Sequence, residues 1–438
     1  MKRISVLIAL MLPLAAFAQG HGPWTLRECI DYALEHNISL QQQDLQVRQQ
    51  EIQLDMAKGN RLPDVSASAS ENFSFGRGLT ADNTYSNANT SSTGLSLGTS
   101  VPIYQGLRLK NNILENELNL KAVTADLEKA KEDMSVAVAQ AYVQILYNME
   151  LRDVALNQVV IDSLQVERLK ALLDNGKASP AELAQQKATL GQSRLSATEA
   201  ANNLNLSLLD LSQLLELPNP EGFSIVVPDV PLDGLLLGNP EDIYADAITS
   251  KPSIKAEQFR LDATEYSIKS AKGAFLPSLS ASGGLGTNYY TMSSAPSSSF
   301  FDQVKHNFSQ YLGLSLSVPI FTGFQTRNQV RAAELSRTNQ ILQLENSKKS
   351  LYKEIQQAYY NAVAARERYH SSIGAEDSAK ESFELVKAKY ENQKANITEF
   401  NEARNNWFAA ESTLARARYE YLYCVKLLDF YRGRRLEF

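Results

Sequence analysis

Few residues in this sequence have the types and spacing that catalysis or metal binding requires. The four histidines, His21, His36, His306 and His370, show no metal-ligand spacing with one another or with cysteine. The glycine-rich run Gly283-Gly284-Leu285-Gly286 lies inside an alternating strand pattern, and no helix follows it as a phosphate-binding loop would require. The sequence therefore predicts no enzyme, no metal site and no cofactor.

Two acidic residues, Glu399 and Glu402, have a spacing that could serve a function. They are three residues apart at the start of a predicted helix, so both lie on one face of it. In a threefold assembly such carboxylates would form a ring around the axis, and a ring of this kind favours cations. The alternative is a solvated helix start, where acidic side chains interact favourably with the helix dipole. The two residues alone leave both interpretations open.

The elements that must position these carboxylates occur twice in the chain. Residues 57–68 resemble residues 271–282, and Val101-Pro-Ile-Tyr-Gln-Gly106 resembles Val318-Pro-Ile-Phe-Thr-Gly323. Each copy has the order helix, strand, loop, strand, long helix, turn and helix. A repeat of ~215 residues is a tandem duplication and is far longer than a solenoid unit.

The duplication predicts the domain boundaries. The first repeat is expected over residues 19–217 and the second over 241–438, with a proline-rich linker at 218–240 between them. The predicted segments of the first repeat are strands at about 64–75 and 94–104, a long helix over 106–175 and a return helix over 180–217. Those of the second are strands at about 278–290 and 309–321, a long helix over 323–392 and a return helix over 397–431.

The four predicted strands each have two different faces. In the last one, Leu312, Leu314, Leu316 and Val318 alternate with glycine and serine. Strands of ~9–11 residues cross a bilayer when tilted, but four strands do not close a barrel, and open edges are unstable in lipid. Two chains would give eight strands, barely enough for a filled barrel, and three would give twelve, enough for a lumen, so we expect a trimer with a twelve-stranded barrel in lipid.

The helices are predicted to pack as coiled coils. Seventy residues without an internal proline make a helix of ~105 Å, which needs a partner along its length. Gly176 suits the position after a helix end, Ser179 an N-cap and Pro180 the first helical position. Cys424 lies in an apolar stripe and is predicted to be a small buried side chain, while a bond between it and Cys29 stays open.

Charge and hydropathy limit the partners. A formal net charge of −6 argues against nucleic acid. Lys2 and Arg3 precede an apolar run that ends in Ala16-Phe17-Ala18, so residues 1–18 are predicted to be a signal peptide. After it no apolar run approaches the ~18–20 residues of a membrane helix, so strands must make any crossing.

Several features of the sequence together resemble the TolC-type outer-membrane efflux proteins. They are the duplicated order of elements, the Leu-Pro that enters each β-hairpin, the Val-Pro-Ile-aromatic-x-Gly that leaves it, and the Asn-Gly-Lys-Ala-Ser turn. The resemblance runs from Thr25 to the carboxyl terminus. It implies a homotrimer in the outer membrane of a Gram-negative bacterium, with a long helical tunnel in the periplasm. It also implies a passive gated duct for efflux or type I secretion, opened when a periplasmic adaptor (membrane fusion) protein and an inner-membrane pump dock.

The resemblance assigns roles to three groups of residues. A periplasmic gate would contain Tyr390, Glu399 and Glu402; Ala395 stands where the family's latch has an arginine, so a salt-bridged latch is not expected. The turns between the long and return helices would contact the adaptor; the alternative is that they are ordinary tight turns. The residues of these turns are Asn175, Gly176, Lys177, Ala178, Ser179, Asn392, Lys394, Ala395 and Asn396. The junction of barrel and tunnel would contain Pro63, Pro102, Gly106, Pro277, Pro319 and Gly323.

The competing interpretation of the function is a structural protein without a pore. Such a protein would be secreted or periplasmic and built from coiled coils. The hairpins argue against it, because a soluble scaffold has no need for four ~10-residue strands with one lipid-like face.

Overall fold

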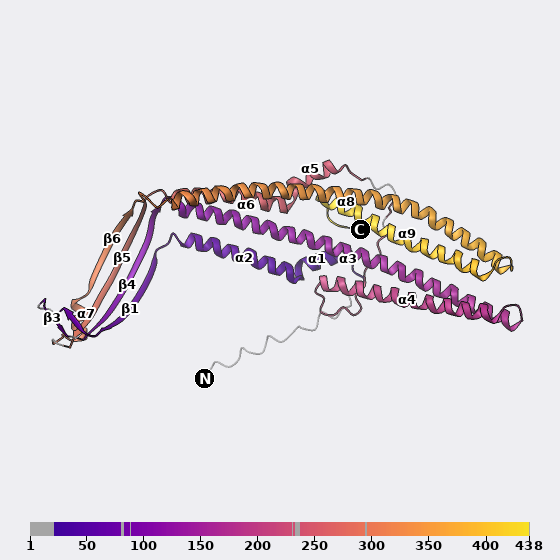
Figure 1. The fold of residues 1–438 in the computed structure, drawn as a ribbon, viewed down its shortest axis with the longest axis horizontal. Coiled ribbons are helices and arrows are strands. Elements are labelled where there is room, and N and C mark those ends of the chain that lie inside the picture. Colours follow the sequence, from indigo (N-terminus) through magenta and orange to yellow (C-terminus); the bar gives the residue numbers. More distant parts are fainter. Residues whose placement is uncertain are drawn as a thin grey trace, which may run out of the picture. The chain divides into compact units, whose positions relative to one another are not determined.

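The computed structural model describes residues 22–79, 83–87, 89–229, 231–232, 237–293 and 296–437. The predicted signal peptide, residues 1–18, lies outside this range. Among the described helices, none has both the length and the apolar character that a membrane crossing requires. Figure 1 shows long helices together with a set of extended strands.

The helices confirm the internal duplication, because each helix of the first repeat has a counterpart of identical length in the second. The pairs are α1 (Leu26–His36) with α5 (Pro240–Ser250), α2 (Ile38–Gly59) with α6 (Pro252–Gly273), α3 (Arg108–Asp174) with α8 (Gln325–Glu391), and α4 (Pro180–Leu214) with α9 (Ile397–Tyr431). The lengths are 11, 22, 67 and 35 residues in that order. At 1.5 Å per residue, α3 and α8 are each ~100 Å long.

The chain forms two compact units. The first contains the described residues up to Asp44, together with Leu127–Pro252 and the chain from Lys348 onward. The second contains Leu45–Asp126 and Ser253–Ser347. Both repeats contribute to each unit, and α3 and α8 each have residues in both.

The second unit contains an antiparallel sheet in the order β1 (Asp64–Ser74), β4 (Thr90–Gln105), β5 (Ser278–Met292) and β6 (Ser309–Ser317). Its register places Ala67 opposite Leu97 and Leu97 opposite Leu285, so apolar side chains share one face while serine and glycine share the other. The apolar face is exposed: Leu312 has 95% of its surface accessible. Within the described chain β1 and β6 are edge strands.

The loops of the hairpins differ from the prediction. The segment between the strands predicted at about 64–75 and 94–104 contains a small ladder of β2 (Arg77–Leu79) and β3 (Tyr85–Asn87), and β4 already begins at Thr90. In the second hairpin the short helix α7 (Phe300–His306) lies between β5 and β6. Both segments are short and lack a hydrophobic period, which is why their sequences read as loops.

The last strand ends earlier than expected. A strand was predicted over 309–321, but β6 ends at Ser317, and Val318 to Phe321 are outside it. Ser317 pairs with Ser278, the first residue of β5, so no partner backbone remains for the residues that follow. The equivalent stretch of the first hairpin stays in β4 because it pairs with the start of β5.

The first unit packs the amino-terminal segment and part of the linker against α3. Val226 donates its backbone N–H to the carbonyl of Trp24 (2.9 Å), and the Tyr142 hydroxyl donates to the carbonyl of Val226 (2.6 Å). Cys29 and Cys424 are both buried and unbonded, so the prediction for Cys424 is confirmed. Burial raises the pKa of Cys29 to about 12 and that of Cys424 to about 11, which keeps both thiols protonated.

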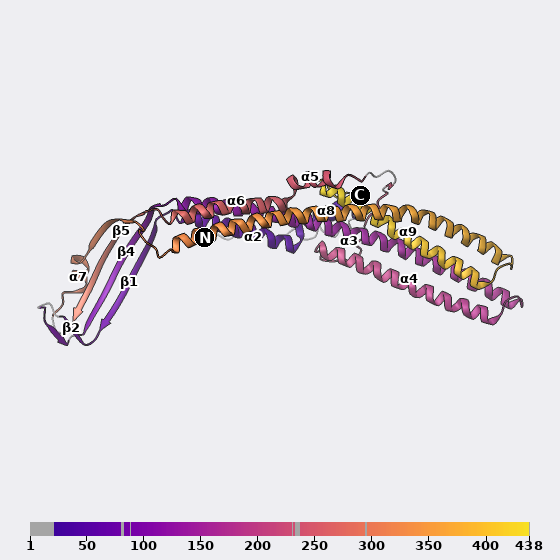
Figure 2. The ribbon, with the colours of Figure 1, turned by 45° about the horizontal axis from the view of Figure 1, so that its top comes forward.

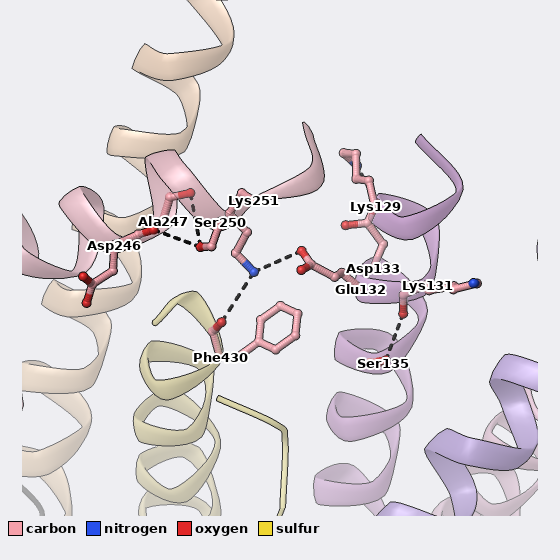
Figure 3. Close-up of polar contacts among 10 residues, drawn as sticks. All are labelled: Lys129, Lys131, Glu132, Asp133, Ser135, Asp246, Ala247, Ser250, Lys251 and Phe430. Atoms are coloured by element: carbon pink, nitrogen blue, oxygen red, sulfur yellow. Dashed lines mark hydrogen bonds and ion pairs between the residues drawn. The ribbon is translucent and has the colours of Figure 1, made fainter. Parts of the chain in front are cut away.

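Lys251, the C-cap of α5, joins three elements of the first unit (Figure 3). Its side chain is 7% exposed, and its ammonium group lies 3.0 Å from Glu132 Oε2 on α3. It also donates to the carbonyl of Phe430 (3.4 Å) and lies 3.9 Å from the centroid of the Phe430 ring. These contacts fix the carboxyl-terminal end of α9 against α3 and the α5–α6 connection.

Candidate functional site

The connection between α3 and α4 (tip 1, residues 175–179) is a tight turn with a defined cap at each end. Gly176 has φ +68°, its N–H donates to Leu173 O (2.9 Å), and the N–H of Lys177 donates to Leu172 O (2.8 Å). This pattern is a Schellman motif, which requires a left-handed residue and so favours glycine. The Asn175 side chain donates to Ala171 O at 2.7 Å.

The connection between α8 and α9 (tip 2, residues 392–396) has the same geometry. The N–H of Lys394 donates to Lys389 O (2.8 Å), that of Gln393 to Tyr390 O (3.1 Å), and the Asn392 side chain to Ala388 O (2.8 Å). Gln393 has φ +59°, although it is not glycine. The asparagine shared by both tips therefore has a structural role, because it satisfies a carbonyl of the last helical turn.

Each return helix begins with a side-chain cap, as predicted for Ser179 and Pro180. Ser179 Oγ accepts from the N–H of Glu182 (3.1 Å), and Glu182 accepts from the N–H of Ser179 (2.9 Å). In tip 2, Asn396 Oδ1 accepts from the N–H of Glu399 (2.9 Å), and the Asn396 amide donates to Glu399 Oε1 (2.7 Å). Glu399 is thus the duplicated counterpart of Glu182 and belongs to a cap.

The remaining predicted tip residues are accessible. Lys177, Lys394 and Glu402 are exposed, while Ala178 and Ala395 are half-buried. Neither lysine has a hydrogen-bond or ion-pair partner among the residues that the structure describes. In Figure 2 the loop between α3 and α4 and the loop between α8 and α9 project beyond their helices.

Tyr390, the third predicted gate residue, lies where the helical hairpin of α3 and α4 meets the helical hairpin of α8 and α9. Its ring is 5.1 Å from that of Phe400, and the Arg168 guanidinium of α3 is 5.3 Å from its centroid. Arg168 also donates to the carbonyl of Glu391 (3.2 Å). Burial raises the pKa of Tyr390, so its hydroxyl stays protonated at neutral pH. Tyr390 therefore contributes to a contact between α3 and the end of α8.

The same contact contains a buried charge pair that sequence reasoning missed. Arg404 of α9 forms an ion pair with Asp162 of α3, and both side chains are almost completely buried. Ser193 and Gln186 of α4 donate to the same carboxylate, Gln186 over 3.2 Å. A signal was present, because residues 400 and 408, one turn on either side of Arg404, are phenylalanines and supply no acidic partner.

A second group of carboxylates lies further along the hairpins. Glu411 of α9 has one buried oxygen, Oε2, with no partner among the described residues. Burial, Glu376 and Glu150 raise its pKa, in that order of importance. Glu376 accepts a hydrogen bond from Trp407 Nε1 at 2.8 Å. No group of three or more potential ligands in the described chain is arranged to hold a metal ion.

The predicted junction residues lie in the second unit at strand ends and helix starts. Pro63 and Pro277 directly precede β1 and β5, Pro102 lies at an irregularity in the pairing of β4, and Pro319 follows β6. Gly106 and Gly323 both have φ +60°. A Cβ on Gly106 would lie 2.2 Å from the Gly273 carbonyl oxygen, so only glycine fits there.

Comparison with known proteins identifies the family. The family model described as "Outer membrane efflux protein" matches residues 29–216 and 243–433. Outer membrane protein OprJ of Pseudomonas aeruginosa is 26% identical over 397 residues, which cover 88% of this chain and 79% of that protein. Outer membrane protein TolC of Escherichia coli is 23% identical over 359 residues, 79% of this chain and 71% of TolC.

A solved structure with the same fold is the open state of the MtrE outer membrane channel of Neisseria gonorrhoeae. Its TM-score is 0.74 at 22% identity, and the match covers 94% of this chain and 90% of that one. Together with the match of the family model to both repeats, these similarities show that the chain belongs to the outer membrane efflux protein family.

Proposed function

We propose that this outer-membrane efflux channel works as a homotrimer and is the exit duct of a tripartite assembly. In this assembly its two tips contact a periplasmic adaptor protein, which connects the channel to an inner-membrane pump. The observation that carries the proposal is the pair of tips: two exposed turns of equal geometry, each at the end of a 67-residue helix that also takes part in the sheet-bearing unit.

The sheet supports the trimer. Its edge strands β1 and β6 leave backbone groups unpaired, and such edges are costly in lipid. Three copies would supply twelve strands and join β6 of one copy to β1 of the next. The exposed leucines of one face would then contact lipid, and the serine and glycine face would line a wet lumen.

The side chains at the tips support an adaptor contact. Asn175 and Asn392 cap their helices, so they explain the turns without a partner. The side chains of Lys177 and Lys394 do not take part in the turns, yet they occupy the same position of both and are exposed. Next to them the small, half-buried Ala178 and Ala395 leave room for a partner helix. An adaptor with acidic side chains on helical hairpins fits this surface.

The gate is proposed at tip 2. Glu402 is exposed one turn after Glu399, and Tyr390 at the end of α8 packs against Phe400, which lies between the two glutamates in the sequence. In a trimer these acidic residues would form rings at the periplasmic mouth, which favour cations and disfavour anions. Gating would then be a displacement of tip 2 that widens the rings.

The test combines assembly, conductance and crosslinking. Purified protein is expected to be a trimer by native mass spectrometry and to form channels in planar lipid bilayers, where Glu399→Gln/Glu402→Gln reduces cation selectivity. A photo-crosslinker at Lys177 or Lys394 is expected to capture one periplasmic protein in cells, whereas the same probe at the exposed Lys349 of α8 is not. Monomers without conductance would refute the duct, and equal capture at all three positions would refute the tips as the docking surface.

A further inference from the structure

The short helix α7 occupies the place where β6 does not continue along β5 (Figure 1). β6 pairs with β5 only as far as Gly286, although β5 itself continues to Met292. On this uncovered edge the Gln303 side chain donates to Tyr290 O (2.9 Å) and accepts from Tyr290 N (2.9 Å). The Asn307 side chain donates to a further carbonyl of β5 at 2.7 Å. These bonds take the place of a strand ladder and hold α7 on the sheet.

α7 packs on the leucine-bearing face of the sheet. The Thr287 hydroxyl donates to Val304 O of α7 (2.6 Å), and the Tyr289 ring lies 5.1 Å from the Phe300 ring. In the register Thr287 lies opposite Leu95, and side chains two residues apart on a strand share a face. The contacts of Thr287 and Tyr289 therefore place α7 on the same side of the sheet as the leucines.

The leucine-bearing face becomes polar at the level of α7. Thr93 and Ser91 continue this face of β4 beyond Leu95, and their hydroxyl groups donate to the Glu71 carboxylate of β1. In a membrane strand such a change marks the level at which the strand leaves the hydrocarbon layer. β4 runs from this border to its other end at α3, so in the proposed duct the border lies at the outer surface of the membrane.

The exposed side of α7 combines an aromatic ring with a cation. Phe301 is 82% exposed, and Lys305 is exposed one turn later on the same side of the helix. Phe308, just after the helix, is 56% exposed. Lys305 has no ion-pair partner among the residues that the structure describes, and the Asp302 carboxylate accepts a hydrogen bond from Ser299 (2.7 Å). The ammonium group is therefore free to bind an anion.

A hollow of about 460 Å³ adjoins α7 on the same face of the sheet. Phe308 and Thr287 line it beside α7, and Ala67, Ala69 and Leu97 line the part farther along the strands. The alanines are smaller than the leucines of the neighbouring strands, which leaves the face recessed here. An acyl chain that runs along the strands fits such an apolar recess.

We propose that α7 binds the headgroup region of a phosphate-bearing acyl lipid in the outer leaflet. This inference rests on the proposed function, in which the leucine-bearing face contacts lipid. Phe301 and Phe308 enter the layer where the acyl chains begin, one chain lies in the hollow, and Lys305 binds a phosphate group of the same lipid. An aromatic and a basic side chain on one exposed face suit the border between headgroups and acyl chains.

The first experiment places a fluorescent reporter on α7. Phe301→Trp trimers are reconstituted into vesicles whose lipids carry bromine on the acyl chains, and the emission of Trp24 and Trp407 in the wild type is subtracted. Bromine quenches tryptophan at short range, so the Phe301→Trp variant is expected to lose most of its added emission. Leu312→Trp, at a 95% exposed position of the leucine-bearing face, is expected to be quenched as well. Tyr360→Trp, at a 64% exposed position of α8, is the control that is expected to keep its emission.

The second experiment measures the phosphate contact by native mass spectrometry of delipidated trimers. Lys305→Gln is expected to weaken the binding of lipid A about fivefold and to leave the binding of dephosphorylated lipid A unchanged. Phe301→Ala is expected to weaken the binding of both lipids, because it removes apolar contact area. The matched control for the charge is Lys349→Gln, at an exposed position of α8, which is expected to bind both lipids as the wild type does.

The outcomes separate this inference from the proposed function. Quenching of Leu312→Trp without quenching of Phe301→Trp would overturn the inference and leave the proposed function intact, whereas no quenching of either variant would refute the lipid-facing sheet as well. Equal binding of lipid A by Lys305→Gln and Lys349→Gln, or displacement of lipid A by inorganic phosphate alone, would overturn the lipid phosphate contact. Dissociation of the trimer in Phe301→Ala would show that α7 packs against a second copy of the chain, which would also overturn the inference.

Discussion

Lys251→Met is expected to loosen the carboxyl-terminal end of α9. The substitution removes an ammonium group that is 3.0 Å from Glu132 and 3.9 Å from the Phe430 ring centroid. A hydrogen bond between charged groups contributes about 1.5–3 kcal/mol, and a cation–π contact at a mostly buried site about 1 kcal/mol more. Glu132 is 32% exposed and rehydrates in part, and methionine replaces the apolar stem, so we expect a net loss of about 2–3 kcal/mol.

Hydrogen exchange of the backbone amides near Phe430 measures this loss. A change of about 2–3 kcal/mol in local opening corresponds to exchange that is about 30- to 150-fold faster. A double-mutant cycle with Glu132→Gln isolates the ion pair, whose coupling is expected to be about 1–2 kcal/mol. The carbonyl and ring of Phe430 account for the remainder.

The matched control is Lys269→Met in α6. Lys269 has the same kinds of partner, with Glu265 at 2.7 Å and the Tyr266 ring centroid at 4.7 Å, but its side chain is 47% exposed. We expect no measurable change in the exchange of α6 in this variant, because solvent screens exposed pairs. If Lys251→Met changes exchange near Phe430 by less than threefold, or if the cycle gives no coupling, the burial argument is wrong.

Three further predictions concern the tips and the buried acid. Gln393→Gly is expected to stabilise the first unit by up to about 1 kcal/mol, because glycine adopts the left-handed backbone conformation of this position without strain. Gly176→Ala is expected to destabilise the first unit by about 1–2 kcal/mol for the same reason, and thermal unfolding shows the sign of each change. Ser179→Ala and Asn396→Ala are each expected to cost about 1 kcal/mol through loss of the N-cap, read as faster exchange in the first turn of α4 or α9. Burial raises the pKa of Glu411 in the folded protein, so its contribution to the free energy of unfolding is fully present below the unfolded value near 4.5 and is lost as the pH rises through the folded pKa. Glu411→Gln should therefore stabilise the protein at pH 8 and leave its stability unchanged at pH 4, as measured by thermal unfolding.

Much of the fold was predictable because local signals determine it. The 67-residue helices follow from long runs of helix formers, and Gly176, Ser179 and Pro180 have the conformations that their chemistry favours. The duplicated sequence then required the second hairpin to repeat the first. The alternation of apolar and small residues likewise predicted the two faces of the sheet.

What the sequence left undetermined depends on contacts between distant segments. The pairing of β4 with β5, which places the β1–β4 and β5–β6 strand pairs side by side, follows from no local pattern. The partner of Arg404 was hidden for the same reason, since Asp162 lies on another helix in the other repeat. Glu399 shows the opposite case. Its spacing from Glu402 suggested a ring, yet a local cap already accounts for its position.

The two ends of α9 are held by contacts of different quality, and this difference indicates which contact is easier to break. At the carboxyl-terminal end, Lys251 meets a carboxylate, a carbonyl and a ring. At the other end, Arg404 has a carboxylate but retains a buried Nε without a partner, and neighbouring amide groups are also unsatisfied. Breaking the second contact allows these polar atoms to become hydrated, so its net cost is lower than that of a fully satisfied pair. The contact of α9 with the α3–α4 hairpin is therefore expected to open at Arg404 first, with the region around Lys251 as the fixed end.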